Sequence, residues 1–333
     1  RGWSRLGAAE HGIERGRDAM NIGGIDLDTF LTAMLATGLL RAVPLVLAAL
    51  GEAVAERAGL LNLGIEGMML NGCFFGFYAA YRTDSMVVGM VAGILAALVL
   101  GLVFGVLTIT LRVDQVLVGI AITIFSLGFT GYLFRDLLGG RNVSADVHPL
   151  RISIPGLREI PIIGKALFDQ QAIFYLSWAL VPVFAFLLKR TRFGLNVRAV
   201  GENPFAADAA GVDVVRVRYL AIVIGGIMAG FAGAYLAVAD LRIFTEGMTV
   251  GSGFIALAIT MLGRWNPYRI VIGAVLFGML RALGDGLQVI GVDIRTEFIG
   301  MMPYIGIMLA LVVLAGRTAL PSALGVPYVR GHR

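Results

Sequence analysis

The sequence predicts an all-α polytopic membrane protein with about ten transmembrane helices. Of its 333 residues, 58% are hydrophobic and only 15% are charged, whereas a soluble domain carries roughly 25% charged residues. Apolar stretches near 20 residues, the length that crosses a bilayer, recur along most of the chain. The 45 glycines are typical of membrane helices that pack closely through small residues.

Nine runs are apolar enough to form membrane helices. They cover 29–50, 67–81, 86–111, 115–138, 172–188, 219–240, 251–263, 268–290 and 298–316. A tenth segment, GEAVAERAGLLNLGIEG at 51–67, is too polar for an ordinary span and too apolar for a loop. Its Gly59, Asn62, Gly64 and Gly67 predict a broken helix, whose irregular backbone must be shielded from lipid by protein.

A second segment looks like the counterpart of the broken helix. In FTEGMTVGSGFIALAITMLG, residues 244–263, a Glu and several Gly, Ser and Thr residues precede a short apolar helix. Paired interrupted segments in the two halves of a transporter indicate an inverted repeat with a path near the membrane midplane. We therefore expect discontinuous helices and an inverted repeat.

Basic residues predict the orientation. The densest cluster of Lys and Arg lies at 189–218, which assigns this segment to the cytoplasm. Counting crossings backwards places 139–171 outside, and a cytoplasmic N-terminus then requires 51–67 to cross the membrane as well. The sequence thus predicts ten crossings with both termini in the cytoplasm.

These crossings divide the chain into three parts. We expect a cytoplasmic extension at 1–27, a transmembrane permease domain at 28–317 and a cytoplasmic tail at 318–333. Residues 1–19 have no apolar core or cleavage site and so do not resemble a signal peptide. Met20 is a candidate native start, with the stretch before it an upstream extension.

The cytoplasmic stretch VRAVGENPFAADAAGVDVVRVR predicts a short helix between two membrane spans. Asn203 suits the N-cap, Pro204 suits the first helical position, and Gly211 suits the C-terminal stop. Three alanines are expected to form a small-residue face on this helix: Ala206, Ala207 and Ala210. The helix is either a docking site for a cytoplasmic partner or an ordinary surface helix.

Several polar residues fall within the predicted spans, where polar groups line a cavity or pair internally. Asn62 and Glu66, at the helix break, either line a path or satisfy the broken backbone. Glu246 and Thr249 either form an outer gate or serve packing. Arg57 is expected to pair with a glutamate one turn away.

Motifs for chemistry are missing from the sequence. It contains no G-x-x-x-x-G-K-[ST] phosphate-binding loop, and its three histidines are far apart and outside the spans. The basic residues flank apolar segments, as in membrane loops. We therefore expect no catalytic residue, metal site or bound cofactor, and no nucleic-acid partner.

Three stretches resemble one family. VRAVGENPFAADAAGV is similar to the coupling segment of ATP-binding-cassette (ABC) importer permeases of the ribose, branched-chain amino acid and nucleoside branch. LVLAALGEAVAERAGLLNLGIEGMML (45–70) and FTEGMTVGSGFIALAITMLGRWNP (244–267) resemble the nucleoside-type permeases that work with a basic membrane lipoprotein. The resemblance extends over 40–316 in the expected order.

The resemblance implies a non-enzymatic permease subunit that moves a small polar solute, nucleosides first, inward across the inner membrane of a bacterium. Its implied partners are cytoplasmic ATPase subunits that bind the ATP, a second and different permease chain, and an extracytoplasmic solute-binding protein. Sugars or branched-chain amino acids are the alternative solutes. An ion-coupled secondary transporter is a further alternative, although it would leave the coupling segment without a purpose.

The resemblance also implies two sets of site residues. Those that contact the ATPase are Gly201, Glu202, Asn203, Pro204, Ala206, Ala207, Ala210 and Gly211. Those along the substrate path are Asn62, Glu66, Asn71, Thr123, Glu246, Thr249 and Ser252. Thr123 stands where relatives are expected to carry Asn, and Ser252 stands where Arg is common. The sequence therefore supports the importer class more strongly than it supports nucleosides as the solute.

Overall fold

The computed structural model describes residues 21–22 and 25–289, isolated positions between 295 and 312, and residues 320–329. The predicted extension up to residue 19 lies outside the described residues, as do most of the last predicted helix and the ends of the predicted tail.

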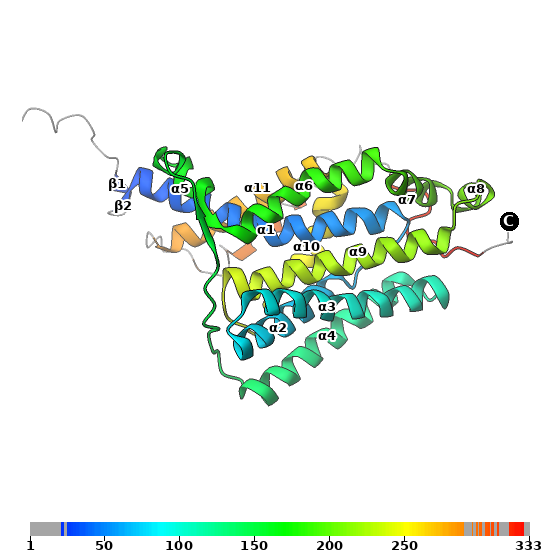
Figure 1. The fold of residues 1–333 in the computed structure, drawn as a ribbon, viewed down its shortest axis with the longest axis horizontal. Helices are drawn as coiled ribbons and strands as arrows, with labels where there is room; N and C mark the ends of the chain where they lie inside the picture. Colours follow the sequence, from blue (N-terminus) through cyan, green and yellow to red (C-terminus); the bar gives the residue numbers. More distant parts are fainter. Residues whose placement is uncertain are drawn as a thin grey trace, which may run out of the picture.

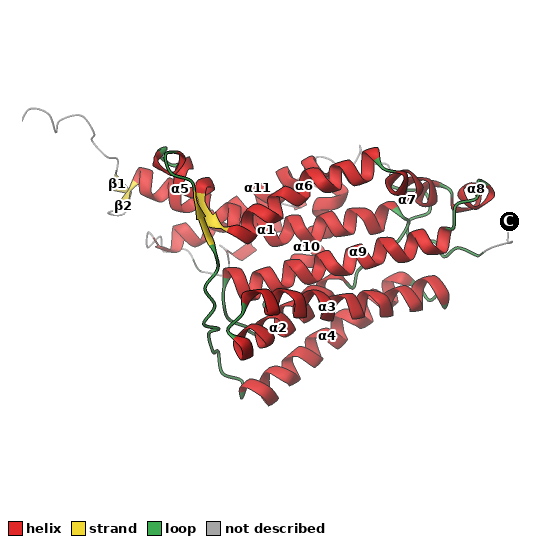
Figure 2. Cartoon of the chain, in the orientation of Figure 1, coloured by secondary structure: helices red, strands yellow, loops and turns green. Residues whose placement is uncertain are grey.

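Helices make up most of the described chain, with two short antiparallel strand pairs at one end (Figure 2). The strands are β1 (Asn21–Ile22), β2 (Ile25–Asp26), β3 (Arg151–Ser153) and β4 (Asp169–Gln171). The first helices are α1 (Leu27–Arg57), α2 (Ile65–Thr83), α3 (Met86–Gly105), α4 (Gln115–Leu138), α5 (Ile163–Phe168) and α6 (Ala172–Arg190). The later ones are α7 (Arg192–Glu202), α8 (Pro204–Ala209), α9 (Val214–Ala234), α10 (Ser252–Leu262) and α11 (Pro267–Val289). Short π-helical turns extend α3 over Val106–Thr110 and α9 over Tyr235–Asp240, and Leu157–Glu159 forms a 3₁₀ turn.

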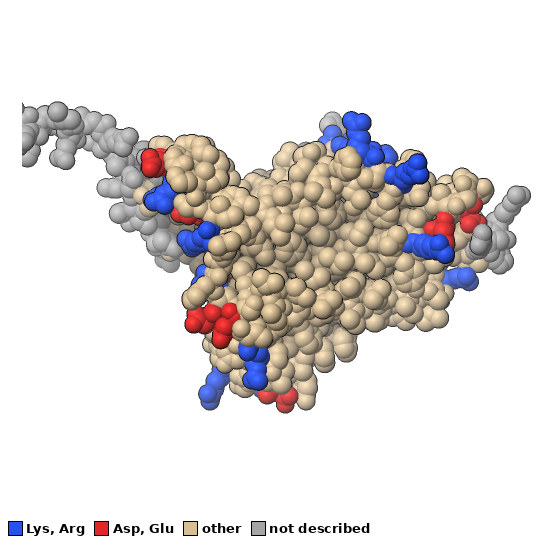
Figure 3. Space-filling view, viewed as in Figure 1, with Lys and Arg blue, Asp and Glu red and all other residues tan. Residues whose placement is uncertain are grey.

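Six of the described helices are long and apolar enough to cross a membrane: α1, α3, α4, α6, α9 and α11. α10 is apolar but shorter. The long helices lie side by side along the long axis of the molecule (Figure 1), and on the face shown in Figure 3 the charged side chains gather toward its two ends. This arrangement confirms an all-α polytopic membrane protein, whereas the count of ten crossings is not confirmed and the inverted repeat stays a prediction.

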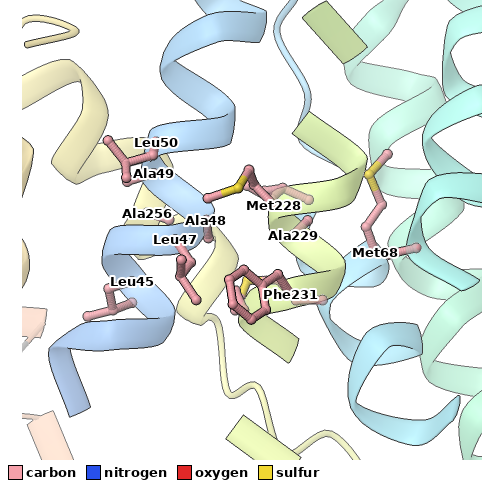
Figure 4. Packing of buried hydrophobic residues seen from close by; sticks show 14 of the residues in the cluster. Leu45, Leu47, Ala48, Ala49, Leu50, Met68, Met228, Ala229, Phe231 and Ala256 are labelled. Carbon is pink, nitrogen blue, oxygen red and sulfur yellow. The ribbon is translucent and has the colours of Figure 1, made fainter. Parts of the chain in front are cut away.

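The centre of the bundle is α9, which packs against α1, α2 and α3. Small residues permit this close packing: a Cβ at Gly233 would lie 2.0 Å from the Met69 carbonyl oxygen of α2. Met228 and Phe231 of α9 lie between α1 and Met68 of α2 in the buried core (Figure 4). α9 is therefore the central packing helix of the described chain.

The structure corrects the prediction of a separate crossing at 51–67. α1 continues without interruption through Arg57, because Glu, Ala and Arg are good helix formers and the first helix breaker after them is Gly59. Only the segment 58–64 is irregular, and α2 starts directly after it.

This correction removes the parity argument for a cytoplasmic N-terminus. That argument needed the segment 51–67 to cross the membrane independently. The first part of this segment, 51–57, belongs to α1 instead. The start of α1 lies at the opposite end of the molecule from α7 and α8 (Figure 1).

Candidate functional site

Glu66 connects the two interrupted segments. Its Oε1 accepts hydrogen bonds from the Thr249 hydroxyl and from the Gly251 N–H, the latter at 2.9 Å. Its Oε2 accepts from the Gly253 N–H at 2.6 Å. Ile65 starts α2 and Ser252 starts α10, so this buried carboxylate lies at the N-terminal ends of two helices, where backbone N–H groups favour negative charge.

The approach of α10 to Glu66 depends on a glycine. A Cβ at Gly253 would lie 2.7 Å from both the backbone N and the Cα of Glu66. Real side chains do not come this close, so a larger residue would push α10 away from the start of α2. Gly253, which the sequence analysis did not single out, therefore shapes this contact.

Side chains of α1 and α4 satisfy the irregular segment 58–64. These bonds run from the Asn62 N–H to Glu52 Oε1 (3.2 Å), from the Leu61 N–H to Gln115 Oε1 (2.7 Å) and from the Thr123 hydroxyl to the Leu63 carbonyl (3.3 Å). Non-helical backbone at membrane depth requires such protein partners. Glu52 and Gln115 were not among the predicted site residues, although a buried Glu near a predicted break was a usable signal.

Several buried polar atoms around the break have no hydrogen-bond partner in the described structure. They include Asn62 Oδ1, Gln115 Nε2 and Ser126 Oγ, as well as Glu52 Oε2 and Arg218 Nη2. Ser126 lies against Gly67 at the start of α2, where the Ser126 Oγ would be 2.7 Å from an added Cβ. Since most buried polar groups are bonded, such atoms are candidates for contact with a solute or with water.

The remaining predicted path residues divide into two groups. The Asn71 amide donates to the Gly67 carbonyl of its own helix at 3.0 Å, and the Ser252 hydroxyl donates to the Thr249 carbonyl. Both residues are buried, and Ser252 lies between the two glycines whose N–H groups bond Glu66. Glu246 lies apart from them.

Glu246 forms an ion pair near the end of α4. Arg135 donates through Nε and Nη2 to the two carboxylate oxygens of Glu246, both at 2.8 Å. The side chains of Arg135 and Glu246 are 71% and 41% exposed. The hydrogen bonds from Arg135 lower the pKa of Glu246. Glu246 therefore belongs to an exposed ion pair.

Arg57 does not pair with a neighbouring glutamate as expected. Its guanidinium lies 5.5 Å from the ring centroid of Trp265, and the Trp265 indole N–H donates to Glu56. Since the Glu52 carboxylate bonds the Asn62 N–H, both glutamates face other partners. The partners of these three side chains are therefore set by contacts with distant segments and not by their one-turn spacing along α1.

The predicted cap and stop signals of the short polar helix are confirmed. The Asn203 side chain accepts a hydrogen bond from the Ala206 N–H at 3.0 Å, and Pro204 occupies the first turn of α8. Gly211 adopts a φ of +84°, which suits glycine. α7 was not predicted from the sequence, because Gly194 and Gly201 interrupt an otherwise helical pattern.

Only part of the predicted small-residue face of α8 is exposed. Ala206 and Ala210 are exposed, whereas Ala207 is only 4% exposed and packs into the core. Phe205, with 47% exposure, flanks these two alanines. The physical reason is that alanines one position apart point about 100° apart around a helix, so they do not share one face.

Gly201 brings α7 against the end of α1. A Cβ at Gly201 would lie 2.1 Å from the Arg57 carbonyl oxygen. The Gly201 carbonyl also accepts a hydrogen bond from the Ala323 N–H at 2.9 Å, and Glu202 accepts one from the Ser322 hydroxyl at 3.2 Å. The segment 320–329, hereafter the C-terminal strap, therefore packs on the α7–α8 element.

The same strap also contacts the helix break. The Gly325 N–H donates to the Gly59 carbonyl at 3.1 Å. The buried Arg218 of α9 donates to the Ala58 carbonyl at 3.2 Å and to the Val326 carbonyl at 3.0 Å. At the other side, the rings of Tyr328 and Phe205 lie 5.4 Å apart. The strap thus links α8 to the irregular segment 58–64.

Comparisons with known proteins agree with this architecture. Residues 34–314 match a family described as "Branched-chain amino acid transport system / permease component". The guanosine ABC transporter permease protein NupQ of Bacillus subtilis is 34% identical over 321 residues, which cover 93% of this chain and 100% of that protein. The nucleoside ABC transporter permease protein NupC of Lactococcus lactis subsp. cremoris is 31% identical over 309 residues, covering 90% and 98%.

A sugar-related protein is also similar. The putative glucose ABC transporter permease protein TsgC13 of Haloferax volcanii is 38% identical over 262 residues, 77% of this chain and 78% of that protein. A permease component of this family is not an enzyme, and ATP is used by the partner ATPase. Through residues 34–314 the chain belongs to the family of branched-chain amino acid transport system permease components, and it is a permease subunit of an ABC importer.

Proposed function

We propose that this permease subunit moves nucleosides inward across the inner membrane of a bacterium. The observation that carries the proposal is similarity over almost the full chain to a guanosine permease and to a nucleoside permease. A sugar is the second candidate, since the glucose-related permease is 38% identical over a shorter region.

The proposed route passes the break between α1 and α2. Support comes from the unpartnered Asn62 Oδ1 and Ser126 Oγ, which can bond the hydroxyl or base groups of a nucleoside. Glu66 and Thr123 hold the break in shape, and Glu246 lies at an exposed edge. The full set of proposed route residues is Asn62, Glu66, Asn71, Thr123, Ser126, Glu246, Thr249 and Ser252.

The meeting of α2 and α10 at Glu66 supports the interpretation of these segments as paired interrupted helices. Each begins within the bundle after an irregular stretch. This is the arrangement expected for an inverted repeat with a path at the midplane. We propose this repeat on the basis of that arrangement.

The proposed power source is a cytoplasmic ATPase that docks on the exposed side of α8. Ala206 and Ala210, four residues apart, present a small exposed surface beyond the membrane helices, and the half-exposed ring of Phe205 flanks it. Motion of α8 would reach the break through Gly201, which touches the end of α1, and through the C-terminal strap. A second permease chain and an extracytoplasmic binding protein complete the proposed importer.

The α7–α8 end is proposed to face the cytoplasm. The basic cluster at 189–218 supports this orientation. The start of α1 would then lie toward the outer face, because it is at the opposite end of the molecule (Figure 1).

The function is tested by deleting the gene and measuring uptake of labelled guanosine, glucose and leucine by the cells. We expect guanosine uptake to fall, glucose and leucine uptake to be unchanged, and the full-length chain to restore guanosine uptake. Selective loss of glucose or leucine uptake would replace the nucleoside by that solute. Uptake that follows a proton or sodium gradient and ignores ATP depletion would contradict the ABC mechanism.

A further inference from the structure

A small cavity at the α7 end of the molecule is surrounded by basic side chains. Its volume is about 210 Å³. The nine lining residues come from the ends of α1 and α6, the middle of α7, the turn after α10 and the start of α11, and the basic ones are Arg57, Lys189, Arg198, Arg264 and Arg269. Five of these nine residues are basic and none is acidic. The cavity is therefore suited to a small group that carries negative charge.

Aromatic rings help to place the basic groups. Arg57 lies 5.5 Å from the centroid of Trp265, and Lys189 lies 5.8 Å from the centroid of Tyr268. Arg57 and Arg198 are close enough to repel each other, and Glu202 attracts Arg57 from the α7 side. A phosphate between these cations would relieve the repulsion and accept charge-assisted hydrogen bonds.

The two helices beside the cavity continue as apolar, exposed faces toward the middle of the molecule. On α6, Phe186 is three residues before Lys189 and is 63% exposed. On α11, Ile272 is three residues after Arg269 and is 68% exposed. Residues three or four apart share a helix face, and α6 packs against α11. A ligand here would meet positive charge at the helix ends and apolar surface beyond it.

An exposed aromatic residue marks the same level of the molecule. Tyr268, which precedes Arg269 and is 54% exposed, lies between the basic cavity and the exposed face of α11, whereas Trp265 is buried and donates its indole N–H to Glu56. Trp and Tyr are enriched at the depth of lipid headgroups, and basic pockets between membrane helices on the cytoplasmic side bind anionic headgroups. The proposed ATPase, which docks outside the membrane, would not explain the apolar faces of α6 and α11 that lead away from the cavity.

We propose that this cavity binds the phosphate of an anionic phospholipid, whose acyl chains lie along the exposed faces of α6 and α11. The proposed orientation of the chain enters only in the choice of leaflet: with α7 and α8 in the cytoplasm, the lipid would lie in the inner leaflet. It requires neither the nucleoside assignment nor docking of the ATPase on α8.

The test measures retention of phosphatidylglycerol and phosphatidylcholine on the purified full-length chain by native mass spectrometry during detergent titration. The binding variant carries Lys189→Gln and Arg269→Gln, both at exposed positions. The matched control carries Arg192→Gln and Arg216→Gln, which remove the same charge from exposed positions that do not line the cavity. A parallel arm adds inorganic phosphate as a competitor.

We expect the binding variant to lose about thirtyfold in affinity for phosphatidylglycerol, from two basic residues near a membrane surface. The control should change by less than about threefold in the same affinity.

Equal losses in both variants, or equal retention of phosphatidylcholine, would overturn the proposal. Displacement of the lipid by millimolar phosphate would assign the cavity to free phosphate instead. Loss of ATPase binding with unchanged lipid retention would assign it to the protein partner. Guanosine uptake is a separate readout, so failure of the nucleoside proposal leaves this result interpretable.

Discussion

At the scale of single residues, the polar side chains at the break serve two different purposes. Glu66 has both carboxylate oxygens bonded by α10 and its preceding loop. Asn62 and Ser126, in contrast, keep buried oxygen atoms without partners in the described structure. Bonded groups contribute to stability and unbonded groups are available to a solute, so substitutions at these positions should separate the two effects.

Glu66→Gln should destabilise the protein. The amide retains only one acceptor oxygen and turns an NH₂ group toward the N–H donors of α10, which costs about 1–3 kcal/mol for the donor left unsatisfied. The measurement is thermal unfolding of the purified chain in detergent, with Glu246→Gln as the control at an exposed ion pair. A variant of unchanged stability that loses transport would show that Glu66 acts on the solute and not through the shape of the break.

Ser126→Ala should have little effect on folding because its hydroxyl has no partner to lose. We expect a change in unfolding free energy below about 1 kcal/mol and a clear reduction of guanosine uptake. The matched control is Thr130→Ala on the same helix, since the Thr130 hydroxyl bonds the Ser126 carbonyl at 2.7 Å and is occupied. Normal uptake by Ser126→Ala would exclude this hydroxyl from the route.

At the scale of elements, α8 and the C-terminal strap form one unit with the helix break. α8 contributes an exposed face, and the strap contacts Gly201 on one side and Gly59 on the other. Buried Arg218 holds the strap and the end of α1 together. Two substitutions distinguish the docking surface from this connection.

Ala206→Glu should insert and fold normally, because the residue is exposed, while it prevents stimulation of the ATPase. Ala207→Glu should instead destabilise the chain, since it places a charge in the core. ATPase activity and membrane insertion are measured together, with Ala206→Ser as the conservative control. Full ATPase stimulation by Ala206→Glu would contradict docking on this face.

Arg218→Gln should release the C-terminal strap. The shorter neutral side chain cannot reach both the Ala58 and the Val326 carbonyls, and each charged hydrogen bond is worth about 1.5–3 kcal/mol. Hydrogen exchange should become faster at the Ala323 and Gly325 amides, which donate to Gly201 and Gly59. Arg216→Gln is the control at an exposed site on the same helix. Unchanged exchange in Arg218→Gln would show that the backbone bonds suffice.

At the scale of the whole molecule, the arrangement of helices changes the expected topology. The start of α1 lies toward one end, with α8 at the other (Figure 1), and Ser85 caps the start of α3. With the single Cys73 replaced by Ala, an impermeant maleimide on intact cells should label Ser85→Cys and Thr29→Cys but leave Ala209→Cys unlabelled. Labelling of Ala209→Cys alone would reverse the orientation, and protection of Thr29→Cys would restore the cytoplasmic N-terminus.

The amino-acid sequence by itself determined the helical membrane class, the local signals around α8 and the resemblance to importer permeases. These follow from composition, from apolar run length and from capping residues such as Asn203 and Gly211, all of which act over a few residues. The matched family and relatives confirm the permease assignment.

Only the tertiary structure decided where polar groups meet. The Glu66 contact with α10 spans nearly two hundred positions, the burial of Ala207 depends on the orientation of α8, and Arg218 joins two segments distant in sequence. Spacing along a chain reports neighbours within one helix, whereas these contacts depend on how whole helices pack. For the same reason the end of α1 at Arg57, and with it the topology, could not be read from polarity alone.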